Sequence, residues 1–416
     1  MKRYGFTITL GVIGVALIAG GCSQMSQPVA MESPAPPPSS AFMKIRSAPD
    51  GLERVPGSYI VVLKESVADA NGVVGELSHS HGVGTDNVYS HAIKGFSAHL
   101  NAEQIQRLAE DDRVEYIEPD MIVTTDAQTL PWGVNNVDAD VSTTLAGNGT
   151  GSVTNVRVYV IDTGIQRNHP DLNVVSGIDF TRRKGGNGED DNGHGTHVAG
   201  TIAAKDNGSY VVGVAPGAPL YAVKVLAANG TGSTSNIVAG IDYVTAQKQA
   251  SPETPMVANM SLGGYVGTTA YGAMDNAVLR SINAGVFYSI AAGNSSADAR
   301  LYSPAHVVEA VTVGAYGSNN AFATSYSNFG AIVDINGPGS SILSTYKGTT
   351  TATLTGTSMA SPHVCGTAAL YLSVNTAANP LAVRNALVAS ATNNAASRVT
   401  SAPAGTTNLA VYAGGY

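Results

Sequence analysis

Four polar side chains of this chain have the types needed for acyl transfer: Asp162, His194, Asn294 and Ser358. A serine hydroxyl is a weak nucleophile at neutral pH and needs a base. A neutral imidazole can take its proton, and a carboxylate can orient the ring and stabilise the imidazolium. An amide N–H, together with the N–H groups at a helix start, can hold a developing oxyanion. The four residues therefore supply every role in acyl transfer.

Each of the four is expected at the boundary of a strand or helix: Asp162 after the apolar strand 156–161, His194 at a glycine-bounded helix start, Asn294 after strand 286–291, and Ser358 at the start of the apolar helix 357–372. A strand end holds a side chain rigidly, and a helix start turns its N–H groups and the positive end of its dipole outward. Taken alone, an Asp after a strand is more often a turn or cap residue.

Strands and helices alternate from residue 127 to the end of the chain. Strands are expected at 156–161, 220–226, 256–260, 286–291 and 310–313, and helices at 235–249, 271–284 and 357–372. Near-continuous apolar strands between helices indicate an α/β fold in which helices flank a parallel sheet on both faces. Functional residues should then gather at the carboxyl ends of the strands.

Composition narrows the class of protein. The chain has 416 residues, of which 44% are hydrophobic, so it can bury a core and is neither disordered nor fibrous. Only 12% of residues are charged and 47 are Gly, which suits an exported, loop-rich protein. The net charge of -8 argues against a nucleic-acid partner. The two cysteines are Cys22, at the end of a leader, and Cys365, so no intrachain disulfide is expected.

The chain divides into four segments: 1–22, an export signal; 23–50, a disordered Pro/Ser-rich tether; 51–126, a small α+β unit; and 127–416, the α/β domain. Residues 23–126 hold 7 basic and 15 acidic side chains, a net charge of -8, which marks them off from the rest. In the small unit we expect strands at 58–63 and 114–119, the second ended by Pro119, and a helix at 102–110 with Asn101 as its N-cap. Such a unit could be an accessory domain.

The leader has three interpretations. Lys2 and Arg3, an apolar run and terminal small residues are typical of an export signal, although a true membrane anchor is the alternative. The sequence 19–22, Ala-Gly-Gly-Cys, also resembles a bacterial lipoprotein box in which Cys22 is acylated. A plain secretory signal cut near Gly21 would leave no membrane stage.

The order Asp, His, Ser within these motifs resembles the subtilases, the subtilisin-like serine proteases. Residues 186–194, 258–264 and 325–330 resemble the proteinase K branch, and the likeness extends over about residues 131–412. Residues 57–123 resemble the inhibitory propeptide of these enzymes. The resemblance implies Asp162, His194 and Ser358 as the catalytic triad, with Asn294 as the oxyanion side chain.

The resemblance also implies a substrate site. Peptide would run antiparallel between two backbone segments, made of Gly230, Thr231 and Gly232 and of Ser261, Leu262 and Gly263. Main-chain pairing ignores side-chain identity, so broad specificity follows. Ala291, Ala292 and Gly293 would form the wall of the primary pocket, and their small size favours aliphatic or aromatic residues before the scissile bond.

Structural calcium is implied in the same way. Related proteases carry Cys at positions matching Asp191, Ala228, Arg300 and Ile332, where this chain has none. Two carbonyls and one carboxylate, of Val308, Ala310 and Asp334, match a calcium site of the family, and oxygen ligands suit Ca²⁺. Alternatively, Asp334 is a plain strand-end residue.

The histidines and Cys365 have simpler explanations. His197 and His363 could join His194 as zinc ligands, but the spacing offers neither a Glu base nor a third ligand. His197 is expected to pack inside a helix, and Cys365 to be a buried, inert thiol.

The sequence therefore predicts an exported, broadly specific serine endopeptidase, autoprocessed near residues 124–131 from an inhibited zymogen. Its partners would be peptide and protein substrates and its own propeptide, and the enzyme would be a monomer. The membrane would be involved only through a lipid on Cys22 before processing. A pseudoprotease that binds without cleaving is one alternative. An α/β-hydrolase esterase is another, although that fold places Ser before Asp and His in the chain.

Overall fold

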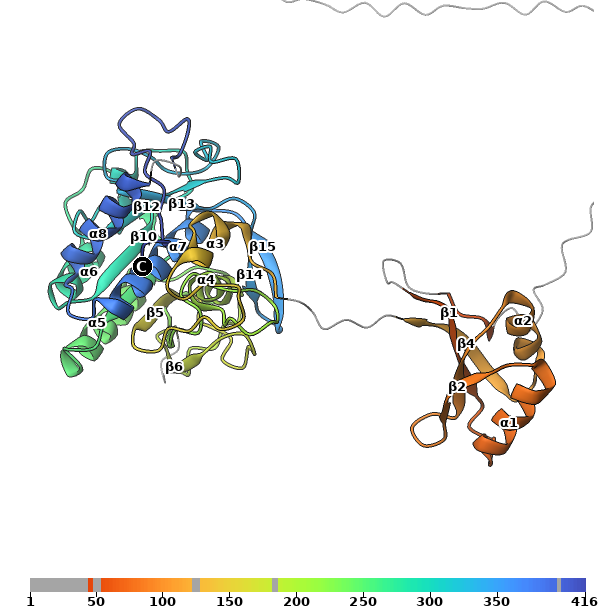
Figure 1. The fold of residues 1–416 in the computed structure, drawn as a ribbon. Coiled ribbons are helices and arrows are strands. Elements are labelled where there is room, and N and C mark those ends of the chain that lie inside the picture. Colours follow the sequence, from red (N-terminus) through yellow and green to blue (C-terminus); the bar gives the residue numbers. More distant parts are fainter. Residues whose placement is uncertain (1–43, 48–53, 122–127, 182–185, 395–397) are drawn as a thin grey trace, which may run out of the picture. The chain divides into compact units, whose positions relative to one another are not determined.

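The computed structural model describes residues 44–47, 54–121, 128–181, 186–394 and 398–416. The chain forms two compact units, residues 1–123 and 124–416 (Figure 1). The expected leader lies outside the described residues. Among those that are described, no helix is both long and apolar enough to span a membrane.

The N-terminal unit is a four-stranded antiparallel sheet packed against two helices. Its elements are β1 (Arg54–Leu63), α1 (Ala70–His81), β2 (Thr85–Tyr89), β3 (Gly95–His99), α2 (Ala102–Glu110) and β4 (Val114–Met121), with strand order β2-β3-β1-β4. Val61, Leu77, Phe96 and Leu108 meet in its core. Asn101 caps α2 as predicted, because its side chain accepts the N–H of Gln104 and the Gln104 side chain accepts the N–H of Asn101.

Pro119 does not end the second predicted strand. β4 continues to Met121, and Pro119 pairs with Tyr59 of β1. β4 lies at the edge of the sheet, where a residue without an N–H is tolerated on the open side.

The second unit is built on a parallel sheet, as the alternation of strands and helices predicted, but the sheet has seven strands. Its strands are β5 (Arg157–Asp162), β6 (Val174–Asp179), β7 (Leu220–Lys224), β8 (Met256–Met260), β10 (Phe287–Ala291), β12 (Val311–Tyr316) and β13 (Ile335–Pro338). Of these, β6 and β13 were not expected from the sequence. The order is β13-β12-β10-β8-β5-β7-β6, and every neighbouring pair is parallel.

Successive side chains of the central strands enter opposite cores. In β5, Val158 and Val160 pack with α4 (His194–Ala203), α7 (Thr357–Val374) and α8 (Pro380–Asn393). Tyr159 and Ile161 pack on the other side with α5 (Thr234–Ala250) and α6 (Ala273–Asn283). Both faces of the sheet are therefore covered, which is why its strands are apolar throughout.

Shorter elements complete this unit: α3 (Trp132–Asn136), η2 (Ala139–Val141), β9 (Gly264–Tyr265), η3 (Ala299–Leu301), β11 (Tyr302–Ser303), β14 (Ile342–Tyr346) and β15 (Thr350–Leu354). β9 pairs with β11, and β14 with β15, as separate antiparallel pairs.

The strand order reverses next to β5. From β5 the chain goes first to β6 at the edge of the sheet, then places β7 between β6 and β5, and then crosses to place β8 on the opposite side of β5. In open parallel sheets a crevice forms at such a reversal, outside the carboxyl ends of the strands. Asp162 is the last residue of β5, and Ser261 directly follows β8.

Candidate active site

Asp162 and His194 form a hydrogen-bonded pair at this crevice, in which Asp162 is buried and His194 is partly exposed. The distance from His194 Nδ1 to Asp162 Oδ1 is 2.7 Å, and the Asp162 side chain is fully buried. A carboxylate can only accept, so Nδ1 carries the proton and Nε2 is left as the basic nitrogen. The pair therefore has the tautomer that a general base requires.

The surroundings favour the imidazolium of His194. Burial lowers the pKa of His194, but the Asp162 carboxylate, through its charge and its hydrogen bond, and the charge of Asp190 outweigh burial, so the pKa lies above the usual value. A proton taken from a nucleophile is therefore held more firmly than by a free imidazole.

Ser358 lies in the first turn of α7, next to the end of β8. Its hydroxyl donates to the backbone oxygen of Ser261 at 3.2 Å, rather than to His194, in the substrate-free geometry. Catalytic hydrogen bonds in free enzymes are often long or misaligned and tighten only when substrate binds. Gly356, with a φ of 157°, immediately precedes this helix, and a side chain there would lie 3.2 Å from the Asn294 amide nitrogen.

Asn294 is held in one orientation. Its amide oxygen accepts the backbone N–H of Thr357 at 2.8 Å and the Thr357 hydroxyl at 2.9 Å. The amide NH₂ is therefore free of these contacts and available as a donor on the same side as Ser358. Asn294 and Ser358 line one small pocket, together with Ala291, Ala292 and Gly293.

Asp190 was not singled out from the sequence, although it lies in the motif that contains His194. Its Oδ1 accepts the N–H groups of Asn192 at 3.0 Å and Gly193 at 2.9 Å and the Thr163 hydroxyl at 2.9 Å. Its Oδ2 accepts the N–H and hydroxyl of Thr196. One carboxylate thereby fixes the turn that begins α4 and ties it to the residue after Asp162.

Lys224 was also not singled out from the sequence. Its side chain is 1% exposed, and the ammonium donates to the carbonyls of Thr163 (2.6 Å) and Leu226 (2.9 Å) and to Asp191 Oδ1 (2.6 Å). These partners belong to the segment after Asp162, the edge of the groove and the turn before His194. A lysine inside the otherwise apolar run 220–226 was the available signal.

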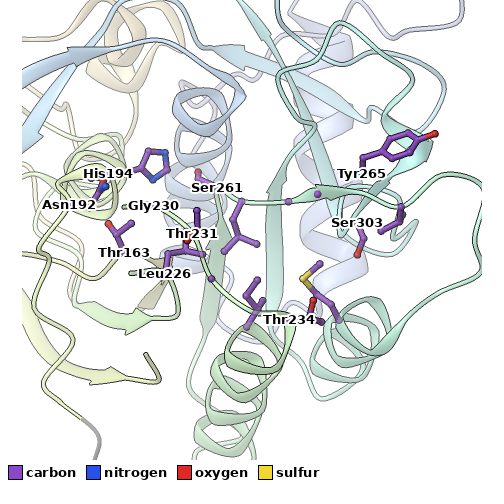
Figure 2. A pocket seen from close by; sticks show the side chains of 17 residues that line it. Thr163, Asn192, His194, Leu226, Gly230, Thr231, Thr234, Ser261, Tyr265 and Ser303 are labelled. Atoms are coloured by element: carbon purple, nitrogen blue, oxygen red, sulfur yellow. Dashed lines mark hydrogen bonds between the residues drawn. The ribbon is translucent and has the colours of Figure 1, made fainter. Parts of the chain in front are cut away.

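The predicted substrate segments form one groove. A cavity of about 550 Å³ is lined by His194, by Gly230, Thr231 and Gly232, and by Ser261, Leu262 and Gly263. Figure 2 shows His194 at one end of this groove and Tyr265 and Ser303 at the other. The small pocket at Ser358 has a volume of about 240 Å³ and shares Ser261, Leu262 and Gly263 with the groove. The structure thus brings together all the predicted catalytic and substrate-binding residues.

Asp334, the one carboxylate of the predicted calcium site, has protein partners in this structure. Asp334 Oδ1 accepts two N–H groups of the Arg384 guanidinium, and Oδ2 accepts the Thr312 N–H at 2.8 Å. Burial raises the pKa of Asp334, and the Arg384 guanidinium opposes that rise. The carboxylate that Val308 and Ala310 would have completed as a site is therefore already neutralised by an arginine. Calcium at these three residues stays a prediction.

A different set of oxygen atoms lies near Asp171 and the side-chain amide of Gln128. The amide nitrogen of Gln128 lies 2.7 Å from the Lys205 carbonyl, 3.1 Å from the Val211 carbonyl and 3.5 Å from the Ser209 carbonyl. The Asp171 carboxylate is fully buried, accepts the amide NH₂ of Asn207 at 3.0 Å, and has its pKa raised to about 7, chiefly by burial. Carbonyl, amide and carboxylate oxygens are the ligands that Ca²⁺ takes.

This second set contains a single acidic residue. The described parts of the chain hold no group of three or more His, Cys, Asp or Glu side chains that could bind a metal. Three of the oxygens around Asp171 belong to the backbone, which leaves no side-chain signature in a sequence. The signal that identifies it is a buried carboxylate next to Asn207 and Val211, of which Val211 also contributes one of three carbonyls that converge on the Gln128 amide.

The remaining histidines and Cys365 behave as core residues. His197 and His363 are fully buried, and burial lowers the pKa of each to about 4. His197 Nε2 donates to the Ile342 carbonyl at 2.9 Å. Cys365 is buried and free, and burial raises the pKa of its thiol. These positions are as the sequence predicted.

Comparison with known proteins identifies the family to which this chain belongs. Residues 154–406 match the subtilase family, and residues 58–126 match the peptidase inhibitor I9 family. The chain belongs to the subtilase family, and its N-terminal unit carries an inhibitor domain. The resemblance drawn from the motifs is confirmed.

Individual proteases with similar sequences or structures support the same family assignment. The chain is 38% identical over 425 residues to the extracellular serine proteinase of Thermus sp. (strain Rt41A), covering 95% of this chain and 96% of that protein. It is 42% identical over 326 residues to the alkaline protease of Alkalihalobacillus alcalophilus, covering 78% and 81%. The crystal structure of a cold adapted subtilisin-like serine proteinase matches with a TM-score of 0.58 and 40% identity, covering 68% of this chain and 98% of that chain.

Proposed function

We propose that the chain is an exported serine endopeptidase that hydrolyses peptide bonds with broad specificity and is made as an inhibited zymogen. The observation that carries this proposal is the 2.7 Å bond between Asp162 and His194, at a groove whose adjoining small pocket is lined by Ser358 and Asn294. Each polar group required for acyl transfer faces the same crevice at the carboxyl ends of the strands.

The reaction follows from these positions. The Ser358 hydroxyl turns from the Ser261 carbonyl toward His194, loses its proton to Nε2, and attacks the peptide carbonyl. The Asn294 NH₂ and the N–H groups at the start of α7 stabilise the oxyanion. The imidazolium, stabilised by Asp162, then protonates the leaving amine as the C–N bond breaks, which leaves the acyl group as an ester on Ser358. Water, deprotonated by His194, attacks this ester, and the second peptide product leaves as Ser358 regains its proton.

Substrate would extend along the groove as an added strand. Gly230–Gly232 and Ser261–Gly263 offer backbone groups on its two sides, which suits recognition by main-chain pairing. Ala291, Ala292 and Gly293 leave the small pocket open, so aliphatic or aromatic side chains would fit there.

The segment boundaries 1–22, 23–50, 51–126 and 127–416 form part of the proposal. The inhibitor unit would block the groove until Ser358 cuts the chain near residues 124–131. If Cys22 is acylated, that cut separates the lipid from the catalytic unit, and a membrane-bound precursor becomes a secreted enzyme. Fractionation of an uncleavable precursor tests this, because a wholly soluble precursor, unaffected by Cys22→Ser, would contradict the anchored stage.

Calcium would have a structural role in this enzyme. Asp171, the Gln128 and Asn207 side chains, and the carbonyls of Lys205, Ser209 and Val211 would hold it. Its charge would neutralise the buried Asp171 and join the start of the catalytic unit to the loop after α4. No catalytic step passes through it.

Labelling with an irreversible serine-directed reagent tests the function. Stoichiometric modification of Ser358, with loss of peptide cleavage, is expected. An unlabelled but folded protein would indicate a pseudoprotease, and hydrolysis of esters without any peptide cleavage would indicate an esterase.

A further inference from the structure

A second buried cluster of Asp, Ser and His side chains lies behind the substrate groove. Asp275, in the first turn of α6, accepts the Ser303 hydroxyl at Oδ1 and the Gly272 N–H at Oδ2, the latter at 2.8 Å. His306 Nε2 lies 3.1 Å from the same Oδ2. The side chains of His306 and Asp275 are 8% and 3% exposed. We call Asp275, Ser303 and His306 the wall cluster.

The wall cluster is not a second nucleophilic triad. The Ser303 hydroxyl donates to the carboxylate and not to the imidazole, so no base is placed to activate it. His306 Nδ1 lies 3.2 Å from the Arg300 carbonyl, which can only accept a hydrogen bond. His306 Nε2 lies close to the Asp275 carboxylate without forming a hydrogen bond to it, so the Ser303 hydroxyl is the side-chain donor that Asp275 holds.

Through Ser303, the buried Asp275 carboxylate holds part of the substrate site. β11 pairs with β9, so that Ser303 lies opposite Gly264 and Tyr302 opposite Tyr265. β9 directly continues Ser261–Gly263, and a Cβ added at Gly263 would lie 3.0 Å from the Ser303 carbonyl. The substrate segment thus rests closely on the residue that Asp275 fixes.

The same short segment separates the two pockets. Ser303 lines the groove of about 550 Å³, at the end remote from His194 (Figure 2). Tyr302 and Ala305 line the pocket of about 240 Å³ next to Ser358. The Ala305 carbonyl is itself held by the Thr312 hydroxyl at 2.6 Å. Alternate residues of one wall therefore face different pockets, and a shift of this wall changes both.

We propose that Asp275, acting through Ser303 and packed against His306, is a positioning residue that sets the wall between the two pockets and thereby the enzyme's selection of extended peptides. This inference rests on the proposed peptidase function. Asp275 contacts no reacting atom. Its effect is on how well a peptide that occupies both pockets is held, and not on the proton transfers at Ser358.

The experiment compares substrates of two lengths in Asp275→Asn, Ser303→Ala and His306→Gln. A single-residue ester reaches only the small pocket, whereas a tetrapeptide anilide extends along the groove. We expect the tetrapeptide kcat/KM to fall by about tenfold or more, mainly through KM, because small misplacements of a binding surface are costly. Ester hydrolysis and the titre of reactive Ser358 should remain close to wild type.

Asp242→Asn is the matched control, since it removes an exposed carboxylate from α5 of the same unit. An equal loss on both substrates, or tetrapeptide kinetics like those of Asp242→Asn, would overturn the proposal. If Asp275→Asn does not fold, Ser303→Ala decides, because it removes one hydroxyl and should still raise KM for the tetrapeptide alone. An unchanged KM in that variant counts against the inference. Failure of the proposed function would instead appear in the wild-type protein, as absence of Ser358 labelling and of cleavage.

Discussion

The amide oxygen of Asn294 accepts the backbone N–H of Thr357 at 2.8 Å. A backbone N–H can only donate, so this bond fixes which end of the amide faces α7 and which end remains for substrate. The substrate-facing NH₂ is thus set by the same turn that presents Ser358, and the nucleophile and its oxyanion donor move as one unit.

Asn294→Asp separates the two roles of this amide. Aspartate can still accept the Thr357 N–H but offers no donor and adds a negative charge near the oxyanion. We expect kcat to fall on the order of 10²–10³-fold, the loss known for one such donor in subtilisin, with little change in KM or melting temperature. Asn294→Ala should lose similar activity, and a variant with Asp that retains full kcat would contradict the oxyanion role.

Ser358→Ala should abolish peptide cleavage and leave the precursor uncut, because one nucleophile serves both reactions. The fold should persist, because the Ser358 hydroxyl makes a single partly buried hydrogen bond, to the Ser261 carbonyl. Intact mass and N-terminal sequencing of the variant, made in a host without other proteases, give the readout. A processed Ser358→Ala protein would contradict self-processing.

The pH profile should report His194. Only the neutral imidazole accepts the Ser358 proton, so activity is lost as the pH falls through the pKa of His194. Burial lowers that pKa, and the charge and hydrogen bond of Asp162 and the charge of Asp190 raise it by more. The acidic limb of kcat/KM should therefore lie above the usual histidine value of about 6.5. In Asp162→Asn the residual activity should show this limb at lower pH, and an unmoved limb would mean that another group titrates.

Chelation of calcium should lower the melting temperature more than it lowers activity at low temperature, because binding stabilises only the folded state. Asp171→Asn should remove most of this calcium dependence. Asp334→Asn is the control, since Arg384 already neutralises that carboxylate. Calcium dependence lost in the Asp334 variant and retained in the Asp171 variant would reverse the assignment.

Lys224→Met should lower both stability and kcat. The Thr163 and Leu226 carbonyls would lose their buried donor, at a cost of about 1–3 kcal/mol for each group left unsatisfied. Lys347→Met is a suitable control, because that exposed lysine also contacts the Asp191 residue. Denaturant unfolding and kcat measured side by side check the expectation, and equal behaviour of the two variants would refute it.

The parallel sheet and the four candidate catalytic side chains could be predicted from the sequence because each is recognisable from neighbouring residues in the chain. The apolar strand that ends at Asp162 and the one that ends shortly before Asn294 can each be recognised from its own short stretch of sequence. The pairing of Asp334 with Arg384 cannot, because it depends on how α8 packs beside the sheet. The carbonyls around Asp171 have no side-chain signature, and the wall cluster forms only where β9 meets β11. The hairpin of β14 and β15, rich in Thr, offered no clear alternation of apolar residues to predict it.

The helix that presents Ser358 is buried along most of its length, from Met359 to Leu372, between the sheet and its neighbours α4 and α8. The nucleophile cannot be released from its geometry by loosening a surface loop. We therefore expect loss of catalysis on heating to accompany collapse of the interior. The working lifetime of such a protease would then be set by the rate of global unfolding, and not by the opening of one surface loop.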